Sequence, residues 1–145
     1  MTAEKLGDIL FYSLEKSIKT YRQFAQRRIN AAGFDITIDQ WLLLKTLQEA
    51  PDATQQQIGE KVFKDFASIT RMVELLVKKG LLKRKQHADD RRRFQLKLTK
   101  EAEQVIEGVQ PIIEMNRRQA LEGIPLSDAS VLRRSLDRII DNCQN

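Results

Sequence analysis

Apolar residues recur with a helical period at both ends of the chain. Between residues 4 and 30 they fall on one side of a helix, and a second stripe runs through residues 100–116. A third begins at Leu132 and continues to Cys143, after a Gly-Ile-Pro break at residues 123–125. The sequence therefore predicts one long amphipathic helix at the N-terminus and two at the C-terminus, the last one capped by Ser127.

Local capping signals divide the middle of the chain into shorter helices. Thr37 and Thr54 each precede a glutamine by three residues, the pattern of a capping box that opens a helix. Asp65 is placed to cap a third helix, which Gly80 ends. The period of that third helix turns four apolar side chains inward: Ile69, Met72, Val73 and Leu76.

After Gly80 the apolar period shortens from 3.6 to 2. Phe94, Leu96 and Leu98 alternate with polar residues, which predicts a half-buried strand with these three side chains facing inward, and Leu82 begins its partner strand. Short helices followed by a hairpin form a winged helix-turn-helix. The predicted fold class is therefore mainly α with a small β wing.

The 145 residues fit one domain. We expect the winged-helix module to cover residues 35–99. Residues 1–34 and 100–145 supply long helices whose apolar faces exceed what so small a module can cover. Such faces are usually buried against a partner, so we expect these terminal helices to form a dimerisation layer.

Positive charge is concentrated in the predicted hairpin. Residues 78–97 contain nine Lys or Arg and two Asp, a net charge of +7, whereas the whole chain carries only +5. A local excess of this kind is the electrostatic footprint of a nucleic-acid binder. Three adjacent arginines at the tip suit the narrow minor groove of DNA.

The helix after Asp65 is the expected reading helix. Its outward N-terminal positions are small or polar, which lets a helix sit deep in the major groove. Amides and lysines around the preceding helix suit phosphate contacts. The predicted DNA-binding residues are Gln55, Gln56, Lys64, Ala67, Ser68, Thr70, Arg71, Lys78, Arg84, Asp90, Arg91, Arg92 and Arg93.

Other classes of function find little support in the residue content. One Cys and one His, His87, are too few for a metal site, and we expect no metal and no cofactor. The sequence has no Gly-rich phosphate loop and no pair of carboxylates in an apolar setting that could act in catalysis, so we do not expect the protein to be an enzyme. We also expect no membrane span, and a cytoplasmic location, since the N-terminus does not resemble a signal peptide and a single cysteine allows no internal disulfide.

Several motifs together resemble the MarR family of bacterial transcriptional regulators. They are Thr37-x-x-Gln40-Trp41-x-x-Leu44-x-x-Leu47, the short helix from Thr54, Thr70-Arg71-x-Val73-x-x-Leu76-x-x-Lys79-Gly80-Leu81-Leu82-x-Arg84, and the wing pattern of Asp90, Arg92, Leu98 and Thr99. The family often has a glycine where this chain has Ala102.

The resemblance implies a homodimer that binds double-stranded DNA at a pseudo-palindromic operator. It also implies a repressor released by a small anionic aromatic ligand, with Arg92 in the minor groove and Asp90 bracing it. The effector-binding residues stay unassigned. The alternative is a winged-helix module that contacts another protein and reads no DNA.

Overall fold

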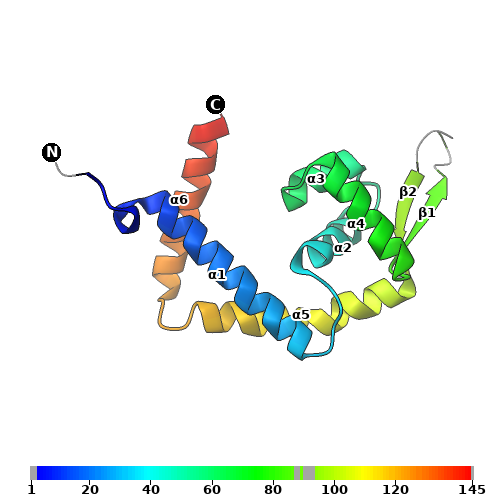
Figure 1. Cartoon of the computed structure of the whole chain (residues 1–145), viewed down its shortest axis with the longest axis horizontal. Helices are drawn as coiled ribbons and strands as arrows, with labels where there is room; N and C mark the ends of the chain where they lie inside the picture. The colour runs from blue at the N-terminus through cyan, green and yellow to red at the C-terminus, as the bar shows by residue number, and fades with distance from the viewer. Residues whose placement is uncertain (1–2, 87–88, 90–93, 145) are drawn as a thin grey trace.

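The chain folds into a frame of long helices joined to a compact module with a small sheet (Figure 1). The computed structural model describes residues 3–86, 89 and 94–144. The elements in that part of the chain are the 3₁₀ turn η1 (Leu6–Asp8), α1 (Leu10–Ala31), α2 (Ile38–Glu49), α3 (Gln55–Val62), α4 (Phe66–Lys78), β1 (Leu82–Gln86), β2 (Phe94–Leu98), α5 (Lys100–Ala120) and α6 (Leu126–Gln144). The winged helix-turn-helix prediction is confirmed.

Each predicted helix start in the module has the expected cap. The Thr37 hydroxyl accepts from the Gln40 N–H at 3.0 Å, and the Gln40 side chain accepts from the Thr37 N–H at 3.1 Å. The same reciprocal pair forms at Thr54. The Asp65 carboxylate accepts from the Ser68 N–H at 2.7 Å. These bonds satisfy backbone donors that a helix start otherwise leaves unpaired.

One hydrophobic core joins the helices of the module to the sheet and to α5. Each of these elements contributes side chains that are almost fully buried. They include Leu43 and Leu44 from α2, Ile58 from α3, Ile69, Val73 and Leu76 from α4, Leu82 from β1, and Ala102 and Val109 from α5. The predicted inward face of α4 is confirmed, with Met72 partly buried against the same core. This packing fixes α4 from one side and leaves its other side to solvent.

The end of α4 is bonded directly to the start of the sheet and of α5. Gly80, with φ of 77°, ends the helix in the left-handed conformation, and the Leu81 N–H donates to the Leu76 carbonyl at 2.9 Å. The buried Thr99 hydroxyl donates to the Gly80 carbonyl at 2.7 Å and accepts from the Ala102 N–H at 3.1 Å. The sheet base is therefore held against the last turn of α4.

β1 and β2 form an antiparallel pair in which Leu82 lies opposite Leu98 and Gln86 opposite Phe94. Leu96 is buried and Leu98 is half-buried. Phe94 takes the same face of the pair as Leu96 and Leu98, as the alternation predicts, but its side chain is 66% exposed and not buried. Phe94 lies at the end of the pair nearer the tip of the hairpin, beyond the reach of the core.

The first and last helices begin at residues other than the predicted ones. The first helix begins at Leu10 and not near residue 4, because η1 precedes it and Ile9 is extended. The last helix begins at Leu126, so Ser127 lies inside its first turn and is not its cap. Cys143, which ends the apolar stripe of this helix, is exposed, since α6 has no buried residue in the single chain.

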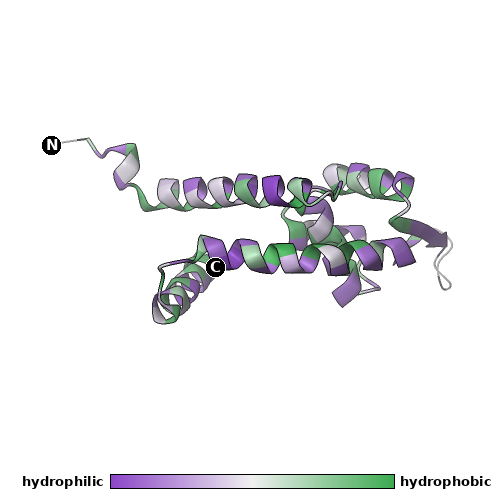
Figure 2. Cartoon of the chain, turned by 90° about the horizontal axis from the view of Figure 1, so that it is seen from below, coloured by the Kyte–Doolittle hydropathy of each residue, from purple (hydrophilic) through white to green (hydrophobic). Residues whose placement is uncertain are grey.

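The frame holds α6 away from the module. In Figure 1, α6 lies at the far end of α5 from the sheet. Hydrophilic and hydrophobic residues alternate along the long helices when the chain is coloured by hydropathy (Figure 2). Their apolar residues are largely exposed, among them Leu6, Leu10, Ile18, Val131, Leu132, Leu136 and Ile140.

Candidate nucleic-acid interface

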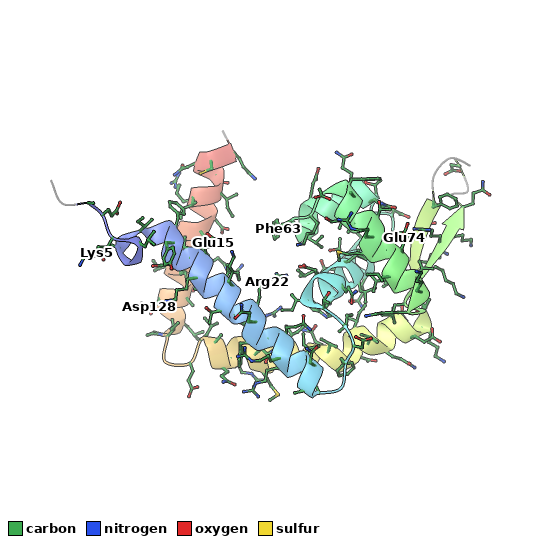
Figure 3. All side chains as sticks on the ribbon, in the orientation of Figure 1. Lys5, Glu15, Arg22, Phe63, Glu74 and Asp128 are labelled. Atoms are coloured by element: carbon green, nitrogen blue, oxygen red, sulfur yellow. The ribbon has the colours of Figure 1, made fainter. Side chains whose placement is uncertain are left out.

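A close approach between α3 and α4 sets the direction of α4. The Gly59 carbonyl accepts from the Lys64 N–H at 2.9 Å. A Cβ at Gly59 would lie only 2.7 Å from the Lys64 carbonyl oxygen, so glycine is needed there. Phe63 links the two helices with φ of 62°, a conformation unusual for a bulky residue, and its ring is 87% exposed. Figure 3 shows Phe63 projecting from this link toward α1.

The outward side of α4 begins with small side chains, as the sequence predicts. Ala67 is exposed and Ser68 is half-buried. The exposed Arg71 lies one turn later, and its Nη2 donates to the Ser68 hydroxyl at 3.3 Å. Glu74 and Lys78 continue the same exposed side, on which Figure 3 labels Glu74.

Thr70 is already bonded within the chain. Its hydroxyl donates to the Phe66 carbonyl at 3.0 Å and accepts from Gln55 Nε2 at 3.1 Å. The predicted role of Thr70 at a base edge would therefore require the bond to Phe66 to be exchanged if Thr70 is the donor, whereas one lone pair of its oxygen stays available to accept. Gln55 is half-buried beside it, whereas Gln56 is exposed at the start of α3.

Lys64, predicted as a phosphate contact, is paired within the chain. Its Nζ lies 3.4 Å from Asp39 Oδ2, and the other carboxylate oxygen of Asp39 accepts from Arg22 of α1. Figure 3 shows Arg22 on the side of α1 that faces the module. Asp39 thus connects α1 to the α3–α4 link, and the predicted phosphate contact of Lys64 would require its pair with Asp39 to be exchanged.

The sheet presents a row of cations next to the end of α4. Lys83, Arg84 and Lys85 of β1 and Lys97 of β2 are exposed. Arg84 lies opposite Leu96 at the middle of the pair. Four predicted residues at the tip, Asp90, Arg91, Arg92 and Arg93, lie outside the described residues, as does His87.

The N-cap of α4 carries the one resolved change in acidity among the described groups. Hydrogen bonds from the backbone and side chain of Ser68 lower the pKa of Asp65 below its usual 3.8, with further help from the charges of Arg71 and Lys64. Asp65 is consequently ionised at neutral pH. Its charge offsets part of the positive potential at the start of α4.

Sequence reasoning missed the exposed phenylalanines around the start of α4. Phe66 is 63% exposed and Phe94 is 66% exposed. Both line a crevice of about 290 Å³ together with the start of α3, including Gln55. A helical projection places Phe66 toward the edge of the apolar side of α4. The sequence therefore indicates on which side of the helix Phe66 lies, but not that its side chain is exposed.

The comparisons with known proteins agree with this architecture. The model of the MarR family matches residues 36–94. A probable transcriptional regulator from Pseudomonas aeruginosa is 30% identical, with a TM-score of 0.82 over 93% of this chain and 99% of that one. The chain belongs to the MarR family. It is thus a member of a family of transcriptional regulators.

Two more distant MarR-like structures share the fold. BpsR from Bordetella bronchiseptica, whose DNA binding is regulated by 6-hydroxynicotinic acid, is 17% identical with a TM-score of 0.87 over 97% of this chain and 99% of that one. CouR from Rhodococcus jostii, solved bound to p-coumaroyl-CoA, is 19% identical with a TM-score of 0.80 over 94% and 95% of the two chains.

The residues that the structure describes contain neither a membrane-spanning helix nor a metal-binding cluster. Across residues 3–86, 89 and 94–144, no helix combines the length and apolar content that crossing a bilayer requires. Within the same part of the chain, no three His, Cys, Asp or Glu side chains come together in a way that could hold a metal ion.

Proposed function

We propose that this MarR-family chain is a sequence-specific repressor that binds double-stranded DNA as a homodimer. The observation that carries the proposal is the exposed surface formed by α4 and the sheet. Small side chains lie at the start of α4, Arg71 follows, and the cations from Lys78 to Lys85 continue onto β1. A helix of this kind suits the major groove, and the adjacent cations suit phosphates.

For the tip of the wing, which lies outside the described residues, the proposal rests on the sequence. Arg91, Arg92 and Arg93 would place guanidinium groups at the minor groove, with Arg92 inserted and Asp90 holding it extended. Arg84 would support the wing base or contact phosphate. Ala67, Ser68 and Arg71 would face base edges, while Gln55, Gln56 and Lys64 would set the position of the module on the backbone.

Dimerisation is proposed from the unpartnered terminal helices. Leu6 and Leu10 near the N-terminus and Val131, Leu132 and Ile140 on α6 are about half exposed or more. Exposed apolar faces on long helices are usually covered by another protein surface. A second copy of the chain would bury both sets at once. Residues 1–34 and 100–145 would then be the dimerisation layer around the module of residues 35–99.

Ligand release is proposed from the relatives. An aromatic acid regulates BpsR, and an aromatic acyl thioester is bound to CouR. We therefore propose a small anionic aromatic effector for this chain, without assigning its pocket. A winged-helix module that only contacts proteins would not need the concentrated positive charge of residues 78–97.

Selection of bound sequences from a pool of random duplexes, followed by footprinting, tests the proposal. We expect two half-sites related by a dyad, with centres about 10–10.5 base pairs apart or a multiple of that spacing. Failure to enrich any sequence would contradict specific DNA binding, and enrichment of a single half-site would contradict the symmetric dimer.

A further inference from the structure

We infer that Phe66 reads the methyl group of a thymine in each half-site, an inference that rests on the proposed DNA binding. Phe66 is the first residue of α4 and follows directly after its N-cap, Asp65. The N-terminal residues of a reading helix are those that contact base edges in the major groove. Phe66 therefore lies at the end of α4 that the proposed reading helix would present to the groove, on the flank between its outward and inward sides.

The side chain of Phe66 lies mostly in solvent. It is 63% exposed, although Ile69, one turn along the same helix, is completely buried. Solvent alone gives no reason for a large apolar ring at this position. A surface that removes the ring from water on binding does give one.

The nearest hydroxyl on this edge of α4 already uses its only donor within the chain, which leaves the ring as its largest unpartnered group. The Thr70 hydroxyl is bonded to the Phe66 carbonyl at 3.0 Å and to Gln55 at 3.1 Å. Phe94 of β2 lies on the same crevice of about 290 Å³. The two rings form an apolar part of this crevice, beside Asp52, whose carboxylate accepts from Gln95 Nε2 at 3.0 Å, and none of the described residues that line it is a cation. At this one spot next to the cationic surface, contact with an apolar group of the duplex is favoured over contact with phosphate.

The major groove offers one apolar group on its base edges, the C5-methyl of thymine. Cytosine, guanine and adenine present only hydrogen-bonding groups there, to which a phenyl ring has no polar atom to offer. Thymine is therefore the base that Phe66 fits. The arrangement also implies that uracil, which lacks the methyl group, would not replace thymine at that position.

Replacement of thymine by deoxyuridine in the selected operator tests this inference, one thymine at a time. With the full-length protein, we expect one thymine in each half-site whose replacement weakens binding about fourfold, the value of one buried methyl-sized group. Phe66→Ala should weaken binding to the thymine operator and lose this discrimination, so that thymine and deoxyuridine bind equally at that position. Phe66→Leu, which keeps an apolar group, should restore part of it.

Controls separate the inference from folding and from the proposed function. Phe66→Ala places a good helix former at an exposed position, so its thermal unfolding should match the parent. Leu75→Ala, which truncates a 49% exposed apolar side chain further along α4, should keep the discrimination. If Phe66→Ala retains the same deoxyuridine penalty, or if no thymine shows one, the inference fails while DNA binding stands. If no duplex is selected at all, the inference and the proposed function both fail.

Discussion

Gly59→Ala should destabilise the fold by disturbing the link that aims α4. The new Cβ would lie 2.7 Å from the Lys64 carbonyl oxygen and 3.5 Å from Ile69 Cγ1. The first distance must grow by about 0.7 Å to reach ordinary contact, and the atom in the way belongs to the backbone. The Lys64 N–H, which donates to the Gly59 carbonyl, moves with it.

The expected cost follows from three contributions. Overpacking a buried site costs about 1–3 kcal/mol, and loss of the hydrogen bond adds about 1 kcal/mol. Alanine returns about 1 kcal/mol as a better helix former than glycine. The free energy of unfolding should therefore fall by about 1–3 kcal/mol, which lowers the urea midpoint by about 1 M at a typical slope.

Urea unfolding followed by circular dichroism measures this change. Protein concentration is held constant, because the stability of a dimer depends on it. Gly7→Ala is the matched control, since a Cβ at Gly7 meets nothing within 4 Å. A midpoint for Gly59→Ala equal to or above that of the parent would refute the reasoning. Selected DNA should also bind more weakly to Gly59→Ala, because α4 turns relative to α3.

Four further predictions concern other parts of the chain. Thr99→Val removes two hydrogen bonds at a buried hydroxyl and should lower the free energy of unfolding, measured by urea unfolding, by about 2–4 kcal/mol. Thr99→Ser keeps the hydroxyl and should retain most of the parent's stability. The lowered pKa of Asp65 contributes stability that is present above pH 3.8 and is lost as the pH falls through the folded value. Asp65→Asn should therefore show less acid sensitivity in unfolding titrations, and equal sensitivity would contradict the linkage. Arg71→Ala should weaken binding by about 1–3 kcal/mol and relax preference at one base pair, measured over a panel of operator variants; a uniform loss would make Arg71 a phosphate contact. Deletion of residues 127–145 should give monomers in sedimentation velocity, and a fully dimeric product would refute the role of α6.

Signals confined to one turn of the chain predicted the local structure well. The caps at Thr37, Thr54 and Asp65 depend on side chains three residues apart, so a short window of sequence contains both partners. The inward face of α4 follows from its period alone. The Gly80 stop likewise needs only the conformational freedom of one residue.

Features that depend on distant neighbours were not predictable in the same way. Lys64 pairs with Asp39, 25 positions away in the sequence, and Thr70 bonds to Gln55, 15 positions away. Both partners become neighbours only when the module is folded. The exposure of Phe94 was not predictable for the same reason, because strand alternation tells which face a side chain takes but not how far the core extends.

The central claim is that α4 and the wing form one cationic surface that binds duplex DNA, and the salt dependence of binding tests it most directly. The affinity for the selected operator is measured by fluorescence anisotropy over a range of salt concentrations. If two copies of the surface neutralise about six or more phosphates, the logarithm of the affinity should fall by about 5 or more for each unit of log salt. A slope no steeper than about −1 would show that few phosphates are contacted and would contradict the account.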